Sequence, residues 1–153
     1  MKLGAINFAI GTAVAFGVID AQGRLLKPLY GDSWEIGDFQ INTRSDKKSL
    51  WQALGSQGFD ELSQWRDQDG FKHYGIRLGK FVSQMSLLFR PRTVGLSGGI
   101  IRHNWPRIRE GFDEGFSTIG DYADILPKPD VAAQDSDYTA LAGLSTLLTR
   151  CSF

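Results

Sequence analysis

Apolar residues near the N-terminus form short runs separated by residues that favour turns. Residues 5–10 and 12–19 are rich in Ile, Val, Phe and Ala, and Gly11 stands between the two runs. A polar stretch ending at Gly23 follows, and residues 25–30 then resume the apolar pattern. This pattern is typical of strands joined by tight turns. It predicts three successive antiparallel strands.

Further along, the apolar spacing changes to that of a helix. Residues 71–89 are predicted to form the longest helix, ended by Pro91. Shorter helices are predicted at 47–54, capped by Ser45 or Asp46 and stopped by Gly55, and at 59–67. The expected buried face of the long helix consists of Tyr74, Leu78, Phe81, Val82, Met85, Leu88 and Phe89.

The second half of the chain reads as strand, helix, strand, helix. A strand at 93–97 runs into Gly98 and Gly99, and Pro106 is expected in the first turn of the next helix. A short strand at 124–126 and a final helix beginning after Ser136 or Asp137 complete the order. Three antiparallel strands followed by crossover connections predict one α/β domain over residues 1–153. We expect its mixed sheet to carry helices on both faces.

Composition narrows the possible partners. The 153 residues include seventeen basic and seventeen acidic side chains, so no overall charge attracts nucleic acid or a membrane surface. The one cysteine, Cys151, cannot form an intramolecular disulfide, which fits a reducing cytoplasm. The apolar run 3–19 is interrupted by Asn7 and by glycines, which favours buried strands over a signal peptide.

Three stretches together resemble one family. They are NFAIGTAVAFGVI at 7–19, LFRPRTVGLSGGI at 88–100 and YTALAGL at 138–144. In this order they resemble the second phosphate-binding hairpin, the adenosine-side Gly-Gly loop and the closing helix of ROK sugar kinases (repressor, open reading frame, kinase). The resemblance covers the C-terminal half of such a kinase. It implies a ribonuclease-H-like half of the actin-like phosphotransferase fold.

The resemblance assigns nucleotide contacts to Gly11, Thr12, Gly98 and Gly99. Phosphate groups need backbone amides without an intervening side chain, which glycine turns and helix N-termini supply. The alternatives are a plain tight hairpin at Gly11 and an ordinary strand-to-helix turn at Gly98-Gly99. The chain departs from the family at Ala13 and Ala15, where glycine is usual, and these methyl groups weaken the expectation of tight phosphate binding.

Residues 34–38, Trp-Glu-Ile-Gly-Asp, resemble the Glu-Ile-Gly-His element of the family. There the glutamate binds sugar hydroxyls, so Glu35 is the candidate sugar contact; the alternative is a solvated loop carboxylate. Asp38 replaces the histidine. Residues 39–54 contain neither cysteine nor histidine, so we expect no zinc site of the family's kind.

In ROK kinases the first phosphate loop and the catalytic aspartate lie in a first lobe, upstream of the hairpin with which this chain opens. No residue here matches that aspartate. The chain is therefore expected to be a shortened protein, a half that depends on a partner, or a degenerate remnant.

The leading hypothesis is the C-terminal lobe of an ATP-dependent kinase for a hexose or N-acetylhexosamine, inactive alone. It would bind sugar and MgATP only with a first lobe, and pair with that lobe or with itself. One alternative is a sugar-responsive module like the effector domain of a ROK repressor. Another is a structural half-domain at a subunit interface.

Overall fold

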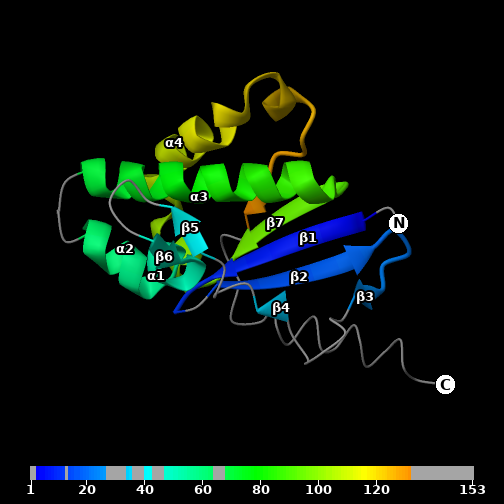
Figure 1. Cartoon of the computed structure of the whole chain (residues 1–153), viewed down its shortest axis with the longest axis horizontal. Coiled ribbons are helices and arrows are strands. Elements are labelled where there is room, and N and C mark those ends of the chain that lie inside the picture. The colour runs from blue at the N-terminus through cyan, green and yellow to red at the C-terminus, as the bar shows by residue number, and fades with distance from the viewer. Residues whose placement is uncertain are drawn as a thin grey trace.

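A central mixed sheet organises the fold (Figure 1). The computed structural model describes residues 3–12, 14–26, 34–35, 40–42, 47–63 and 68–131. Strands run in the order β3-β2-β1-β7-β8, with β4 also pairing with β2. Their bounds are β1 Leu3–Ile10, β2 Val14–Asp20, β3 Leu25–Leu26, β4 Trp34–Glu35, β7 Thr93–Ser97 and β8 Asp130–Val131. The first three strands are antiparallel, as predicted, whereas β7 pairs in parallel with β1 and β8.

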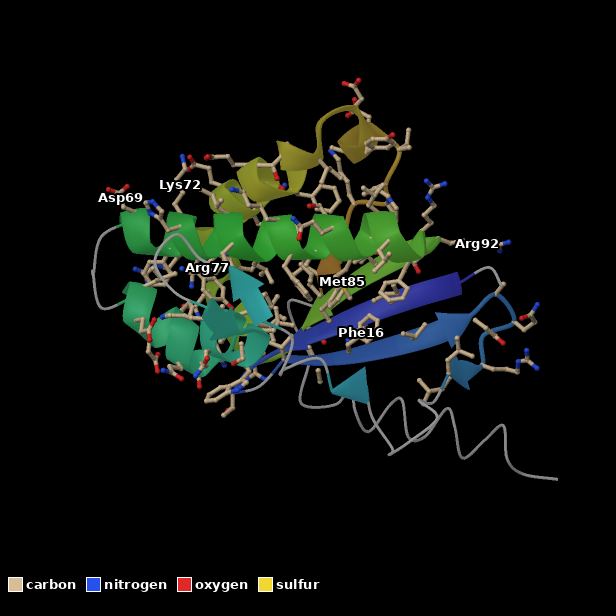
Figure 2. The ribbon with its side chains drawn as sticks, in the orientation of Figure 1. Phe16, Asp69, Lys72, Arg77, Met85 and Arg92 are labelled. Atoms are coloured by element: carbon tan, nitrogen blue, oxygen red, sulfur yellow. The ribbon has the colours of Figure 1, made fainter. Side chains whose placement is uncertain are left out.

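The apolar alternation in β1 and β2 selects the buried face of the sheet. Ile6, Phe8 and Ile10 are buried, and Phe16 on β2 lies opposite Phe8 in the register. The helix α3 (Gln68–Phe89) covers this face. The rings of Phe8 and Phe81 meet edge-on, with their centroids 5.5 Å apart. Figure 2 shows Phe16 and Met85 in the layer between sheet and helix. Side chains at alternate positions thus build one core.

The helices α3 and α4 (Gly99–Phe116) pack unusually close together, with a glycine pair on each. A Cβ atom on any of these glycines would come within 3.0 Å of the backbone of the facing helix. Gly75 and Gly79 of α3 face Ile108 and Phe112, while Gly111 and Gly115 of α4 face Lys72 and Ile76. Only glycine permits this backbone-to-backbone approach. Lys72 adds ion pairs to Glu110 and Glu114 at the exposed rim.

A smaller unit flanks one end of the sheet. It comprises the β5–β6 ribbon (Gln40–Asn42, Lys47–Ser49) and the helices α1 (Leu50–Leu54) and α2 (Ser56–Ser63). Ser49 caps α1 in a capping box with Gln52, so the predicted caps Ser45 and Asp46 were wrong. Lys47 to Ser49 pair as a strand instead of opening the helix, whereas the predicted stop at Gly55 is confirmed.

Two side chains of α3 hold the last turn of α1. The Tyr74 hydroxyl donates to the Leu54 carbonyl at 2.6 Å, and Arg77 donates to the Ala53 carbonyl at 3.2 Å. These carbonyls would otherwise lack partners at the helix end. Burial raises the pKa of Tyr74, which therefore remains a neutral donor, and burial lowers the pKa of Arg77.

Several predicted positions are corrected. Leu88 is 72% exposed, because it lies on the far side of α3 from the core; Phe81 and Met85 are half-buried and Val82 is fully buried. Pro106 lies inside α4, which begins at Gly99 directly after β7. Residues 124–126 form no strand, since the 3-10 helix η1 (Ser117–Asp124) occupies that region and β8 starts at Asp130.

The described helices α3 and α4 cover one face of the sheet. The final helix predicted after Ser136 or Asp137 lies outside the described residues. No described helix is long and apolar enough to cross a membrane.

Candidate functional site

The two glycine turns singled out by the sequence lie side by side. Because β1 and β7 are parallel and pair Ala9 with Ser97, their carboxyl ends reach the same edge of the sheet. Gly98 has a φ of 98°, and a Cβ there would come within 3.0 Å of backbone atoms of Ile10. The backbone of the β7–α4 turn therefore packs directly against the residue that precedes Gly11. Ligands of α/β sheets bind at such an edge.

The N-terminus of α4 opens onto this edge. Gly98 is its N-cap and forms no side-chain capping bond, and the first intrahelical bond runs from the Arg102 amide to the Gly98 carbonyl at 2.9 Å. The amides of the first turn thus have no acceptor within the helix. Gly11 and Gly99 have open space where a side chain would be, and Thr12 and Gly99 are exposed. An anion can approach these amides and the positive end of the helix dipole.

A polar pair ties the two strands together just before the turns. The Asn7 side chain donates to the Ser97 hydroxyl at 2.9 Å across the β1–β7 pair. A Cβ on Gly95 would lie 2.5 Å from the Asn7 side-chain oxygen, so glycine leaves the room that this contact uses. The pair fixes the β7 end that carries Gly98. Its residues give no recognisable sequence signal, and the prediction missed them.

The end of α1 borders the same edge. At Gly55, a Cβ would lie 2.7 Å from the Thr12 carbonyl oxygen, which brings the α1–α2 junction against the β1–β2 turn. Trp51, one turn earlier in α1, is 39% exposed. Phe59, in α2, is half-buried, and its ring meets that of Tyr74 edge-on with the ring centroids 5.1 Å apart.

The other candidate residues are distributed as follows. The Glu35 backbone pairs with Ala15 on β2, near the hairpin turn, while Ala13 and Asp38 lie outside the described residues. His73 and His103 are both exposed. Arg107, which follows the Gly-Gly turn in sequence, stacks over the Phe71 ring at 3.4 Å and so does not point to the glycine edge.

The edge supplies amides and a helix dipole rather than acid–base groups. Over the described ranges, no three His, Cys, Asp or Glu side chains gather into a possible metal site. Phosphate groups would fit the open glycine turns. No cluster of carboxylates that could coordinate the accompanying magnesium ion lies among the described residues. The site is therefore suited to binding and orienting an anionic group.

Comparison with solved structures confirms the fold. The chain is similar to a glucokinase from an Antarctic psychrotroph (TM-score 0.71, 15% identity), covering 95% of this chain and 58% of that one. A ROK family glucokinase from Streptomyces griseus, in complex with glucose and AMPPNP, matches at TM-score 0.66 and 15% identity, covering 94% of this chain and 59% of that one. No protein-family model and no curated protein matches the sequence.

A transcriptional regulator has the same fold. The ROK family regulator described as a homolog of the E. coli MLC protein matches at TM-score 0.65 and 16% identity, covering 86% of this chain and 42% of that one. The chain thus spans between two fifths and three fifths of the length of these three proteins. Kinases and a regulator share this fold, so the fold alone does not separate the two activities.

Proposed function

We propose that this chain is the nucleotide-side lobe of a ROK-type carbohydrate kinase, which binds the phosphates of ATP at the edge formed by Gly11, Thr12, Gly98 and Gly99. The observation that carries the proposal is the packing of Gly98 against Ile10, beside the open N-terminus of α4. This packing brings two amide-rich turns, nearly ninety residues apart in sequence, to one place. The positive φ of Gly98 requires glycine at that position, whereas at Gly11 and Gly99 the lack of a side chain leaves space for a ligand.

The proposal goes beyond the expectation that nucleotide binding needs a first lobe, because it assigns phosphate binding, although not turnover, to the chain alone. Phosphoryl transfer to a sugar also requires a base at the acceptor hydroxyl and a metal ion on the phosphates. We assign both to a first lobe, and with them most of the contacts to a hexose or N-acetylhexosamine. Glu35 is the proposed contribution of this chain to the sugar. Its strand, β4, pairs with β2 beside the β1–β2 turn. This position would let Glu35 contact the sugar while the turn contacts the phosphates. A cytoplasmic location belongs to the same proposal.

The experiment that tests the phosphate site uses two substitutions at one position. Gly99 is exposed and a Cβ there meets nothing within 4 Å, so neither Gly99→Ala nor Gly99→Asp disturbs packing. Aspartate at a helix N-terminus stabilises the fold by ~0.3–1 kcal/mol, but it places a negative charge where the phosphates would bind. Calorimetric titration with MgATP should show Gly99→Ala close to wild type and Gly99→Asp weakened by about tenfold or more, which corresponds to ~1.4 kcal/mol.

The unfolding curves of both variants, measured in urea, separate lost binding from lost folding. Equal MgATP affinity for the two variants, or no saturable binding by the wild-type chain, would contradict the phosphate site. The similarity to a ROK regulator supports a second candidate, a sugar-responsive module without nucleotide binding. Saturable binding of glucose or N-acetylglucosamine together with indifference to MgATP would favour that candidate.

A further inference from the structure

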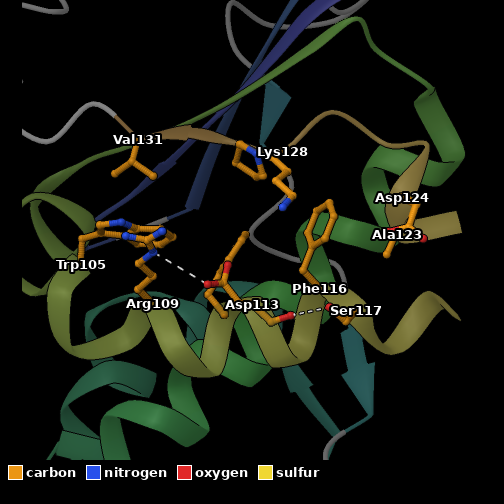
Figure 3. A pocket seen from close by; sticks show the side chains of 11 residues that line it. Trp105, Arg109, Asp113, Phe116, Ser117, Ala123, Asp124, Lys128 and Val131 are labelled. Atoms are coloured by element: carbon orange, nitrogen blue, oxygen red, sulfur yellow. Dashed lines mark hydrogen bonds and ion pairs between the residues drawn. The ribbon is translucent and has the colours of Figure 1, made fainter. Parts of the chain in front are cut away.

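A separate cavity lies along the outer side of α4, away from the glycine edge. It encloses about 510 Å³ between the second half of α4, the helix η1 and the segment that leads into β8 (Figure 3). None of the residues that line it belongs to the glycine turns. Pockets for small ligands typically measure ~300–1,000 Å³ and combine an apolar floor with few polar groups. The volume of this cavity lies in that range, whereas its lining is more polar than is typical, since five of its eleven residues are charged or carry a hydroxyl group.

Three aromatic rings form the apolar wall of the cavity. Trp105 and Phe112 meet edge-on with their ring centroids 5.2 Å apart, and Phe112 stacks on Phe116 at 5.8 Å. Phe112 and Phe116 are buried and Trp105 is half-buried, so the rings are held by the core. A rigid aromatic wall of this kind favours a flat ring, because offset and edge-on contacts between aromatic groups add to the gain from burial.

The cavity is lined by four charged side chains, two of which pair with each other and two of which do not. Arg109 and Asp113, one turn apart on α4, form a mutual ion pair at 3.8 Å. Lys128 and Asp124 also line the cavity, and neither forms an ion pair within 4.0 Å among the described residues. Figure 3 shows Lys128 reaching from the β8 side toward the side chains of α4. The lining is therefore electrically neutral, with one free cation and one free carboxylate.

We propose that this cavity binds a small zwitterion that carries an aromatic ring, of the chemical class of the aromatic amino acids. The ring would lie against Trp105 and Phe116. The carboxylate of the ligand would accept from Lys128, and its ammonium group would donate to Asp124. A purely anionic or purely cationic ligand would engage only one of the two protein charges, and the other would stay hydrated, since both side chains are exposed. This site is independent of the proposed phosphate site, since it involves different residues.

Fluorine NMR titrations test the proposal with three probes that share one ring. They are 5-fluoro-L-tryptophan, the anion 5-fluoroindole-3-acetate and the cation 5-fluorotryptamine. We expect saturable binding of 5-fluoro-L-tryptophan at one site per chain, at least about threefold tighter than either comparator. The absence of saturable 5-fluoro-L-tryptophan binding in the millimolar range would overturn the proposal.

Two charge-removing variants then separate the two ends of the ligand. Lys128→Met should weaken 5-fluoro-L-tryptophan and 5-fluoroindole-3-acetate by about fivefold and leave 5-fluorotryptamine unchanged, while Asp124→Asn should weaken the two ammonium-bearing probes only. The matched controls are Lys80→Met, on the exposed side of α3, and Asp121→Asn, exposed on η1. Equal losses in the variants and their controls, or equal losses for all three probes, would overturn the assignment of the charges.

Discussion

At the scale of single residues, Gly98 connects the fold to the proposed phosphate site. Its φ of 98° lies where side chains are strained, and a Cβ would also meet the Ile10 backbone. We expect Gly98→Ala to lower the free energy of unfolding by more than ~2 kcal/mol. Gly99→Ala is the matched control and should shift it by less than ~1 kcal/mol, in either direction. Urea unfolding followed by circular dichroism measures both. Equal values for the two variants would show that the Gly98 backbone adapts.

A second residue, Asp20, makes stability depend on pH. The hydrogen bond from the backbone amide of Arg24, with further bonds from the Arg24 side chain and the Gln22 amide, holds the pKa of Asp20 below its ordinary value. The ionised carboxylate therefore stabilises the turn above the unfolded-state pKa of ~3.9. That stabilisation is lost as the pH falls through the lower, folded-state pKa.

The comparison that isolates this effect is between the wild type and Asp20→Asn. Their difference in unfolding free energy should be constant from pH 6 to 8 and should shrink steadily below about pH 4. A difference at pH 3 as large as that at pH 7 would mean that the charge of Asp20 does not stabilise the turn.

At the scale of elements, sequence periodicity predicted the strands and the helix whose formation depends on the local pattern of apolar residues. The strands β1, β2 and β7 and the helix α3 follow from alternation or from three-and-four spacing, which neighbouring residues largely determine. The first turn of α4 was misplaced because Pro106 is most frequent at helix starts, yet here it is accommodated inside a helix that begins at Gly99. Asp124 ends the 3-10 helix η1 and residues 125–126 follow it; the course of η1 depends on packing against α3, which no short sequence pattern reports.

The glycine pairs of α3 and α4 allow a test at this scale. In an isolated helix Gly79→Ala would be favourable by ~1 kcal/mol, but here the added methyl meets the carbonyl of Phe112 on the facing backbone. Over-packing costs ~1–3 kcal/mol, so the net effect should be destabilising. Gln84→Ala, exposed on the same helix, should change stability by less than ~0.5 kcal/mol. If Gly79→Ala raises the urea midpoint, the close approach of the two helices is not required.

At the scale of the whole molecule, the sequence predicted the fold class, and its resemblance to ROK kinases assigned both glycine turns to a nucleotide. The two turns meet because they follow the parallel strands β1 and β7, whose carboxyl ends share an edge, a pairing that the sequence pattern did not specify. The cavity beside α4 was not predictable, since Trp105, Asp124 and Lys128 come from segments whose spatial proximity is set by tertiary packing. The Asn7–Ser97 bond escaped prediction for the same reason: ninety residues separate its partners.

The same scale gives an expectation about association. Ile19 and Leu25 lie directly opposite each other on β2 and β3, and they are 37% and 45% exposed. Ala15 lies on the same face of β2 as Ile19 and is exposed as well. In the strand order of the central sheet, β3 stands at one end. An edge strand with apolar neighbours readily pairs with another chain, and a symmetric dimer is the commonest result. We therefore expect the chain to self-associate reversibly in the absence of a first-lobe partner.

Sedimentation velocity over a wide range of protein concentration tests this expectation. The weight-average sedimentation coefficient should rise with concentration, and Leu25→Lys should shift that rise to at least about fivefold higher concentration, because lysine on an edge opposes pairing. Leu88→Lys is the matched control, since Leu88 is 72% exposed on α3, the helix that covers the other face of the sheet. A monomer at every concentration would contradict self-association, and equal effects of the two lysines would place the contact elsewhere than at β3.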